Sequence, residues 1–312
     1  MPFIPLPDNA ARQLIDAQTV FVEHARVARQ AKAYEGGMYW KRQDAHEYLV
    51  RTGRDNRQQR LGPRNPETEQ TYERFMAAKR QVEERLQSLT TALRDAERMN
   101  KALKVGRVPS VVLGVLQVLE QAQLAEHFTV VGTHALYAYE AAAGVRVDAG
   151  SLATQDVDLL WDARKRVRFA GDMERLGASM LRVLQRADPT FVRKDMHNET
   201  AINAKGFEVD FLRRMAQDDD PHPFRFSDDE DDLYPVQARR AHVLTEAAPF
   251  EQVVVSATGR MALMRTIHPR AFVEFKRWMA GRAPDRPALK RRRDRGQADL
   301  VQQMLDEGLL QG

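Results

Sequence analysis

The chain has 312 residues and no cysteine, and 48 Lys and Arg against 44 Asp and Glu give a formal net charge of +4. The absence of cysteine excludes disulfides, thiolate metal sites and cysteine nucleophiles, and it fits a reducing cytoplasm. The N-terminal sequence MPFIPLPDNA has no signal-peptide pattern. The longest apolar stretch, residues 108–119, is shorter than the ~20 residues of a membrane span. We therefore expect a soluble cytoplasmic protein with no membrane partner and with two or three folded units.

Two segments in the N-terminal third have the apolar spacing of amphipathic helices. Residues 9–33 form the first, which ends before Gly36-Gly37. Residues 67–103 form the longest periodic segment, and their narrow apolar seam predicts one long helix. This seam can pair with residues 9–33 as an antiparallel hairpin, or it can join two chains. An oligomer formed through the long helix is therefore one of two open interpretations.

A basic segment, residues 38–64, lies between these helices. It contains seven basic and three aromatic residues against three acids. Aromatic rings stack on nucleobases and arginines bind phosphates through paired hydrogen bonds, so Lys41 to Arg64 can hold an RNA or another acceptor, including a protein. The alternative interpretation is a solvated basic loop whose aromatic residues dock on the body of the protein.

The middle of the chain has the alternating pattern of an α/β unit. Its apolar runs are short and separated by turn residues, which is typical of strands between helices. The predicted order is helix 110–125, strand 128–131, helix 134–143, loop 145–153, strand 154–161 and strand 205–212.

The strand at residues 154–161 carries two carboxylates, Asp156 and Asp158, at alternate positions. Alternate side chains of a strand point to the same face, so the two carboxylates lie next to each other on one face of the strand. Such a pair is unfavourable unless a cation or a proton lies between them, and Mg²⁺ prefers carboxylate oxygens. If residues 205–212 form a neighbouring strand, Asp210 completes a triad.

The first strand of this region ends at Gly132-Thr133. Glycine allows a tight turn, and the backbone amides that enter the next helix can hold a nucleotide phosphate. The Thr133 hydroxyl can donate a hydrogen bond to the same phosphate. His134 follows as a side chain at the start of the helix.

Beyond residue 215 we expect a C-terminal region with an acidic loop, a strand and helices. The acidic, proline-interrupted segment 218–232 lacks the spacing of a calcium loop, so we interpret it as a solvated surface loop. The other expected elements are strand 251–257, helix 269–280 and an amphipathic tail over 290–305.

Gly132-Thr133, the Asp156-x-Asp158 pair and the later Asp210 together resemble the nucleotidyltransferase fold of the DNA polymerase beta-like superfamily. This resemblance covers roughly residues 122–212. More loosely, the whole chain resembles uncharacterised bacterial proteins of this fold that are related to abortive-infection-type toxins. Two features depart from the pattern: Thr133 stands where the family usually has Ser or Gly, and 23 residues separate Gly132 from Asp156, so residues 145–153 look like an insertion.

The resemblance implies an α/β (α+β) fold with a small mixed-sheet core at residues 108–215, an N-terminal helical region at 1–107 and a C-terminal region at 216–312. It implies metal-dependent transfer of a nucleoside monophosphate from a triphosphate to an acceptor hydroxyl of RNA, protein or a small molecule. The metal would be Mg²⁺ or Mn²⁺, held by Asp156, Asp158 and Asp210.

The same resemblance assigns the remaining candidate residues. Gly132, Thr133 and Lys276 would bind the triphosphate, and Asp294 and Asp299 would form a terminal acidic motif. Two alternatives stay open. One is a non-catalytic nucleic-acid-binding or regulatory module of the same fold, and the other is a hydrolase with a carboxylate pair, which needs its two acids on opposite sides of a cleft.

Overall fold

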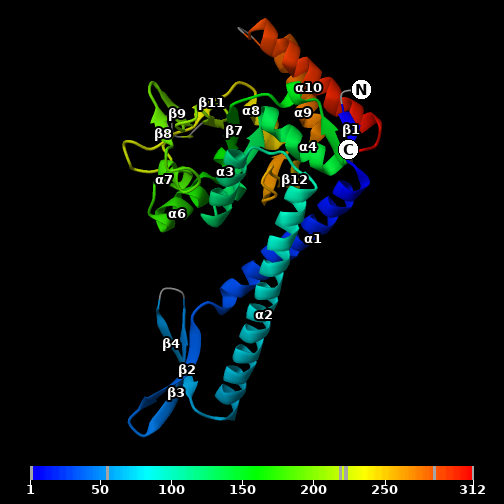
Figure 1. Cartoon of the computed structure of the whole chain (residues 1–312). Coiled ribbons are helices and arrows are strands. Elements are labelled where there is room, and N and C mark those ends of the chain that lie inside the picture. Colours follow the sequence, from blue (N-terminus) through cyan, green and yellow to red (C-terminus); the bar gives the residue numbers. More distant parts are fainter. Residues whose placement is uncertain (1–2, 54–55, 218–219, 221–223, 284–285, 311–312) are drawn as a thin grey trace. The chain divides into compact units, whose positions relative to one another are not determined.

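A computed structural model describes residues 3–53, 56–217, 220, 224–283 and 286–310 (Figure 1). Contacts group the chain into two compact units, one of Met1–Ala11 with Asn100–Gly312 and one of Arg12–Met99. The division at residues 107 and 215 stays a prediction. The fold is mixed α/β, as predicted. In the described part of the chain, no helix combines the length and the hydrophobicity needed to cross a bilayer.

The smaller unit contains an antiparallel hairpin of two helices, α1 (Asp8–Ala31) and α2 (Pro66–Ala102). Both predicted helices are confirmed within two residues at each end. Their seam is closed by a small cluster of Val27, Val82 and Leu89. The hairpin interpretation therefore accounts for the apolar seam of α2. Pairing of two chains through the long helix stays a prediction.

The basic segment between the two helices is a three-stranded antiparallel sheet of β2 (Gly37–Gln43), β3 (His46–Thr52) and β4 (Gln58–Pro63) (Figure 1). The interpretation of this segment as a solvated loop is therefore wrong. Residues 54 and 55 lie outside the described part. The sheet forms because alternate residues pack inward: Leu49 is fully buried and the Trp40 ring lies 5.9 Å from that of Tyr72 on α2.

The larger unit is built on a mixed sheet with eight strands among the described residues. Its order is β12-β13-β5-β7-β10-β9-β8, with β11 beside β10. β5 runs antiparallel to β7, and β7 runs parallel to β10. The bounds are β5 Phe128–Val131, β7 Asp156–Trp161, β8 Val192–Lys194, β9 His197–Ile202, β10 Glu208–Arg213, β11 Val236–Gln237, β12 Pro249–Val255 and β13 Met261–Ile267.

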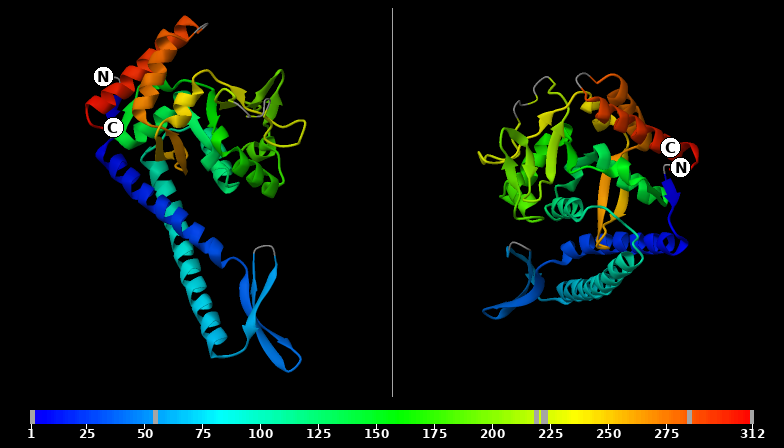
Figure 2. Two further views of the ribbon diagram at one scale, coloured as in Figure 1. Left: turned by 180° about the vertical axis from the view of Figure 1, so that it is seen from behind. Right: turned by 45° about the horizontal axis from the view of Figure 1, so that its top comes forward.

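Helices pack against this sheet through their apolar faces, and their residues join those of the strands in one hydrophobic core. In each view α9 and α10 lie side by side (Figure 2). The bounds are α3 Ser110–Gln121, α4 Ala135–Ala143, α5 Ala149–Leu152, α6 Arg166–Leu176, α7 Met180–Gln185, α8 Ala241–Glu246, α9 Pro269–Gly281 and α10 Ala288–Asp306.

The segment predicted as an inserted loop, residues 145–153, contains β6 (Val145–Val147) and the short helix α5. β6 pairs antiparallel with β1 (Phe3–Pro5), at the very start of the chain. The prediction of a plain loop is therefore wrong, because an ordered strand partner comes from more than 130 residues away.

The acidic segment 218–232 is only partly solvated. Residues 218–219 and 221–223 lie outside the described part. Asp232 is buried and accepts hydrogen bonds from the backbone N–H groups of Met180 (3.0 Å) and Leu181 (2.9 Å), where α7 begins. Asp220 forms an ion pair with Arg166 at 2.8 Å. For these two acids the prediction of a solvated loop is wrong, because each compensates buried donors or cations.

Candidate active site

The candidate active site lies on the neighbouring parallel strands β7 and β10. Their register places Asp210 directly beside Asp158, and Glu208 beside Asp156. Carboxylate oxygens of Asp156, Asp158 and Asp210 lie within 4.8 Å of one another. The juxtaposition expected from the sequence is therefore present in the structure.

Apolar neighbours decide which way these carboxylates point. Val157 and Leu159 on β7 are buried, as are Val209 and Phe211 on β10. Because strand side chains alternate, burial of these residues leaves the intervening aspartates on the other face. The core thus fixes the direction of the three acids.

The three acids destabilise one another's charged forms. Burial, together with the nearby Asp156 and Asp210 carboxylates, raises the pKa of Asp158 to about 7. Burial also raises the pKa of Asp210, although Thr200 donates a hydrogen bond of 2.6 Å to that carboxylate. Thr154 donates to Asp156. A cluster in which ionisation is this costly favours a bound cation or a retained proton.

Gly132 allows one carboxylate to come close to the backbone. Its φ of +70° lies in the left-handed region that glycine tolerates. A Cβ at this position would lie only 2.2 Å from Asp158 Oδ2. Any side chain at residue 132 would therefore displace a carboxylate oxygen of the triad.

Thr133 follows in a single 3₁₀ turn, Gly132–His134, that leads into α4. It is buried, and its hydroxyl accepts a hydrogen bond of 3.2 Å from the side-chain amide of Gln297 on α10. The same amide donates to the Ser151 carbonyl at 2.8 Å. The sequence prediction missed Gln297, although it is a polar residue on the apolar stripe of Leu300, Val301 and Met304.

His134 lies next to the acid cluster, where Asp156 acts to raise its pKa against the larger effect of burial. It is buried, and burial lowers its pKa to about 4, so the ring is neutral near pH 7. Its ring lies 6.1 Å from that of Phe207. We interpret it as a packed side chain at the start of the helix.

A cavity of about 560 Å³ opens over the triad. Asp156, Asp158 and Asp210 line it together with Gly132 and Thr133. Five cationic side chains line the same cavity and oppose the negative charge of the triad. The cavity also has an apolar wall. The cations are Arg239, Lys276, Arg286, Lys290 and Arg293, and the wall includes Leu212, Leu244, Phe275 and Met279. Of the cations, the sequence prediction named only Lys276.

Lys276 belongs to a buried ion-pair network. Its ammonium lies 2.9 Å from Asp294 Oδ1, and Arg286 binds the other carboxylate oxygen of Asp294. Burial lowers the pKa of Lys276, against the effect of Asp294. The Asp294 carboxyl keeps a lowered pKa because Arg286 and Lys276 outweigh the effect of its burial.

Asp294 and Asp299, which the resemblance paired as one acidic motif, have different surroundings. Asp294 is fully buried between two cations, whereas Asp299 is exposed on the other side of α10. The assignment of the two as a terminal acidic motif stays a prediction. Five residues are not a whole number of helical turns, so the side chains of Asp294 and Asp299 lie on different faces of α10.

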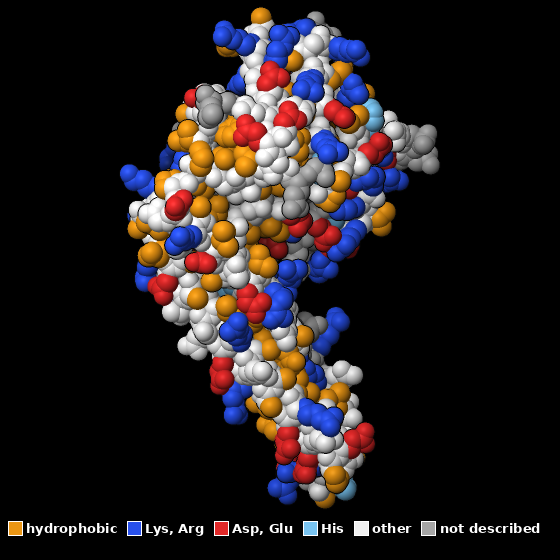
Figure 3. All heavy atoms as spheres, turned by 90° about the vertical axis from the view of Figure 1, so that its right-hand side faces the viewer, with side chains coloured by type: hydrophobic (Ala, Val, Ile, Leu, Met, Phe, Trp, Pro, Cys, Tyr) orange, Lys and Arg blue, Asp and Glu red, His pale blue; other side chains and the backbone are white. Residues whose placement is uncertain are grey.

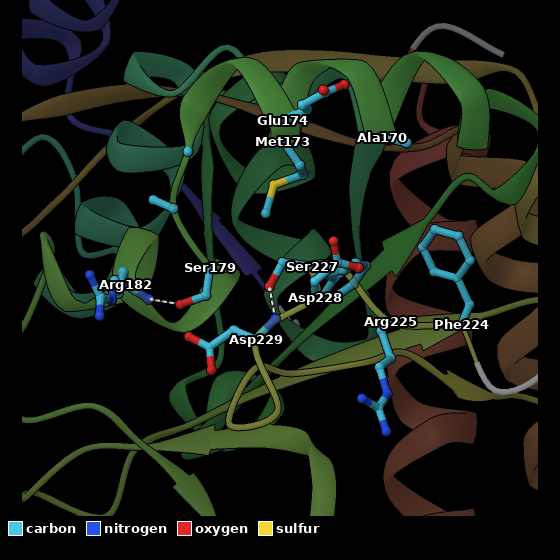
Figure 4. Close-up of a pocket in the computed structure, with 13 residues that line it drawn as sticks. Ala170, Met173, Glu174, Ser179, Arg182, Phe224, Arg225, Ser227, Asp228 and Asp229 are labelled. Atoms are coloured by element: carbon cyan, nitrogen blue, oxygen red, sulfur yellow. Dashed lines mark hydrogen bonds between the residues drawn. The ribbon is translucent and has the colours of Figure 1, made fainter.

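A second cavity of about 600 Å³ lies beside α6 and α7, where Arg182, Arg225, Asp228 and Asp229 are among its lining residues (Figure 4). None of the site residues predicted from the sequence lines it. Ser227 and Asp229 are joined to each other by a local hydrogen bond of 3.4 Å. The site residues predicted from the sequence therefore line the cavity above the triad and not this one.

One of the comparisons with known proteins found a match. A family model described as nucleotidyltransferase matches residues 110–311, which is more than half of the chain and includes every candidate residue of the triad and its cavity. No curated protein and no solved structure matched the chain in the same comparisons. The chain belongs to this nucleotidyltransferase family, and the protein is a transferase enzyme.

Proposed function

We propose that the protein is a metal-dependent nucleotidyltransferase that moves a nucleoside monophosphate from a nucleoside triphosphate to an acceptor hydroxyl and releases pyrophosphate. The observation that carries this proposal is the cluster of three carboxylates, from two parallel strands, with oxygens within 4.8 Å. Family membership supports nucleotidyl transfer in general.

The cluster fits Mg²⁺ or Mn²⁺, since both take carboxylate oxygens. Asp156, Asp158 and Asp210 would hold the metal, and the raised pKa of Asp158 is the effect expected where a cation is needed to balance charge. Bound metal would neutralise the phosphates and stabilise the attacking and leaving oxygens of an in-line displacement.

The cationic wall of the cavity fits the triphosphate. Lys276 and Arg286 lie opposite the triad and keep their positions through Asp294. Thr133 and the backbone N–H groups after Gly132 would contact a phosphate from the other side, and the apolar residues of the wall would cover the base. Asp210, held by Thr200, would accept the proton of the acceptor hydroxyl.

For the acceptor we propose an RNA or a protein that contacts the basic segment Lys41 to Arg64. The resemblance to abortive-infection-type toxins of bacteria motivates this choice. The family match begins at residue 110 and leaves the basic segment outside it.

Nucleotide transfer by the purified full-length protein tests the proposal. Each α-labelled triphosphate would be offered with Mg²⁺ or Mn²⁺, total RNA and a protein extract, in parallel reactions. We expect label to move to one acceptor class, and we expect the Asp156→Ala/Asp158→Ala variant to lose at least about a thousandfold in rate.

The matched control is Glu230→Gln, which removes an exposed carboxylate of the same unit and should keep full activity. Transfer that survives in the double variant would refute the assignment of the triad. Metal-dependent triphosphate binding without transfer to any acceptor would point to an acceptor missing from the assay. Absence of both binding and transfer would favour a non-catalytic module of the same fold.

A further inference from the structure

The outer face of the β2–β3–β4 sheet carries aromatic and basic side chains that are not part of the triad. Register places Tyr39 opposite Val50 and Lys41 opposite Tyr48, while Val50 pairs on its other side with Arg60. Because paired residues share a face, these five side chains form one surface. We call Tyr39, Lys41, Tyr48 and Arg60, around the buried Val50, the outer sheet face.

The opposite face of the same sheet is already occupied. The Arg51 guanidinium lies 4.4 Å from the ring centre of Phe75 on α2, and the Trp40 ring packs beside Tyr72. Leu49 on that face has no exposed surface. The inner face is therefore covered by residues of its own unit, whereas Tyr39, Lys41 and Arg60 on the outer face are exposed.

Charge on the sheet is divided between the two faces. Among the described residues of β2, β3 and β4, the only acid is Glu47, which lies on the inner face and binds Arg64 at 2.7 Å. The outer sheet face carries Lys41 and Arg60 and no carboxylate. On the side of the molecule that Figure 3 shows, Lys and Arg are interspersed with Asp and Glu.

Flat rings lie among these positive charges. Tyr39 is 37% exposed, and the Arg60 guanidinium lies 3.1 Å from the ring centre of Tyr48. Nucleobases stack on aromatic rings and on guanidinium planes, while lysine and arginine bind the phosphates between the bases. Only unpaired bases offer a free face for such stacking, since in a duplex the neighbouring pairs cover it.

We infer that the outer sheet face is a binding surface for single-stranded nucleic acid. Tyr39 and the Tyr48–Arg60 pair stack on bases, and Lys41 and Arg60 neutralise phosphates. The surface lies outside the residues that match the nucleotidyltransferase family. The inference rests on the acceptor part of the proposed function, which already assigns the segment Lys41 to Arg64 to an RNA or a protein. Its test measures binding without nucleotide transfer, so failure of the inference and failure of the transferase assignment are distinguishable.

The test is fluorescence anisotropy of a labelled oligouridylate of about 16 nucleotides, the upper site size of small single-strand-binding modules. The full-length protein is titrated without nucleoside triphosphate and with EDTA. We expect salt-sensitive binding that weakens by about tenfold or more in Tyr39→Ala/Tyr48→Ala. The Tyr39→Phe/Tyr48→Phe variant keeps both rings and should retain binding.

A second pair of variants separates charge from stacking. In Lys41→Gln/Arg60→Gln we expect the slope of log affinity against log salt to fall by about 1.4, at about 0.7 per phosphate contact on a single strand. The matched control, Arg80→Gln/Arg94→Gln, removes the same charge from exposed positions of α2 and should leave the slope unchanged. Circular dichroism of each variant reports whether the unit is folded.

Three results would overturn the inference. They are absence of binding by the folded wild-type protein, equal loss in the α2 control, and equally tight binding of a duplex of the same length. Equal binding by the Ala and Phe variants would also refute stacking. An acidic peptide that competes fully with the oligonucleotide would reassign the surface to a protein partner.

Discussion

The position of Asp158 lowers the stability of the fold while it supplies a carboxylate to the triad. It lies beside two other carboxylates and is partly removed from water, which raises its pKa from 3.8 to about 7. In the metal-free protein the ionised side chain is therefore unfavourable at neutral pH. Sites that need such arrangements commonly lower the stability of the fold that carries them.

We expect Asp158→Asn to stabilise the metal-free protein at pH 8 by about 2 kcal/mol. At about 1.36 kcal/mol per pKa unit, a shift from 3.8 to about 7 gives an upper bound near 4 kcal/mol, which contact with solvent reduces. The pKa is raised in the folded state, so the contribution of Asp158 to stability is complete below pH 3.8 and is lost as the pH rises to about 7. Urea unfolding in EDTA at several pH values measures the difference, which should vanish near pH 4.

Metal provides the control for this prediction. Saturating Mg²⁺ should raise the unfolding midpoint of the wild-type protein and have a smaller effect on Asp158→Asn, since the proposed metal site exists only in the native state. A variant that is less stable than the wild type in EDTA at pH 8 would contradict the electrostatic account.

The helices α9 and α10 matter at the scale of elements, because α9 carries Lys276, which lines the cavity, and α10 carries Asp294, which binds it. Arg286, between the two helices, also lines the cavity and binds Asp294. Lys276 and Asp294 are both almost fully buried. A buried cation needs its partner, and removal of one member leaves an uncompensated charge. The network thus orients the cationic wall and joins the two helices.

We expect Asp294→Leu to destabilise the protein by about 3–5 kcal/mol, the range for a broken buried ion pair. The double variant Lys276→Met/Asp294→Leu removes the two buried charges and leaves only Arg286, whose side chain is 19% exposed, without its partner. It should recover part of this loss, yet it should bind nucleoside triphosphate more weakly than the wild type. Urea unfolding and calorimetric titration measure the two effects.

Asp299→Asn, on the same helix but exposed, should change stability by less than about 0.5 kcal/mol. If the double variant were as unstable as Asp294→Leu, the cost would come from lost packing rather than from the unpaired charge.

The first residues of the chain pack into the larger unit. β1 pairs with β6, and Phe3 joins the main hydrophobic core. Contacts group Met1–Ala11 with Asn100–Gly312, so the intervening unit of residues 12–99 is inserted between two parts of one folded body.

Two adjacent residues test this closure. Phe3 is 7% exposed and Ile4 is 61% exposed. We expect Phe3→Ala to lower the free energy of unfolding by about 3 kcal/mol, because a buried ring is replaced by a cavity. Ile4→Ala should change it by less than about 0.5 kcal/mol, as is usual for surface substitutions. Thermal and urea unfolding of both variants check the contrast, and equal losses would refute the pairing of β1.

Local patterns were sufficient for the elements that carry the triad. The strands β5, β7 and β10 are short apolar runs, and the aspartates stand at alternate positions within them. The sheet of β2, β3 and β4 escaped prediction because its outer face is basic. Lys41 and Arg60 belong to a segment rich in charged and turn residues. In such a segment the alternation of buried and exposed positions, which indicates a strand, is hard to recognise.

The sequence by itself determined that Asp156 and Asp158 share a face, since the period of a strand is a local property of the backbone. It also determined the turn at Gly132, where a positive φ requires glycine. Only the tertiary structure decided that Asp210 lies level with Asp158, that Gln297 reaches Thr133, and that Asp294 joins Lys276 to Arg286. Strand register and helix docking depend on packing between residues far apart in the chain, and a local pattern carries no record of which distant side chains will meet.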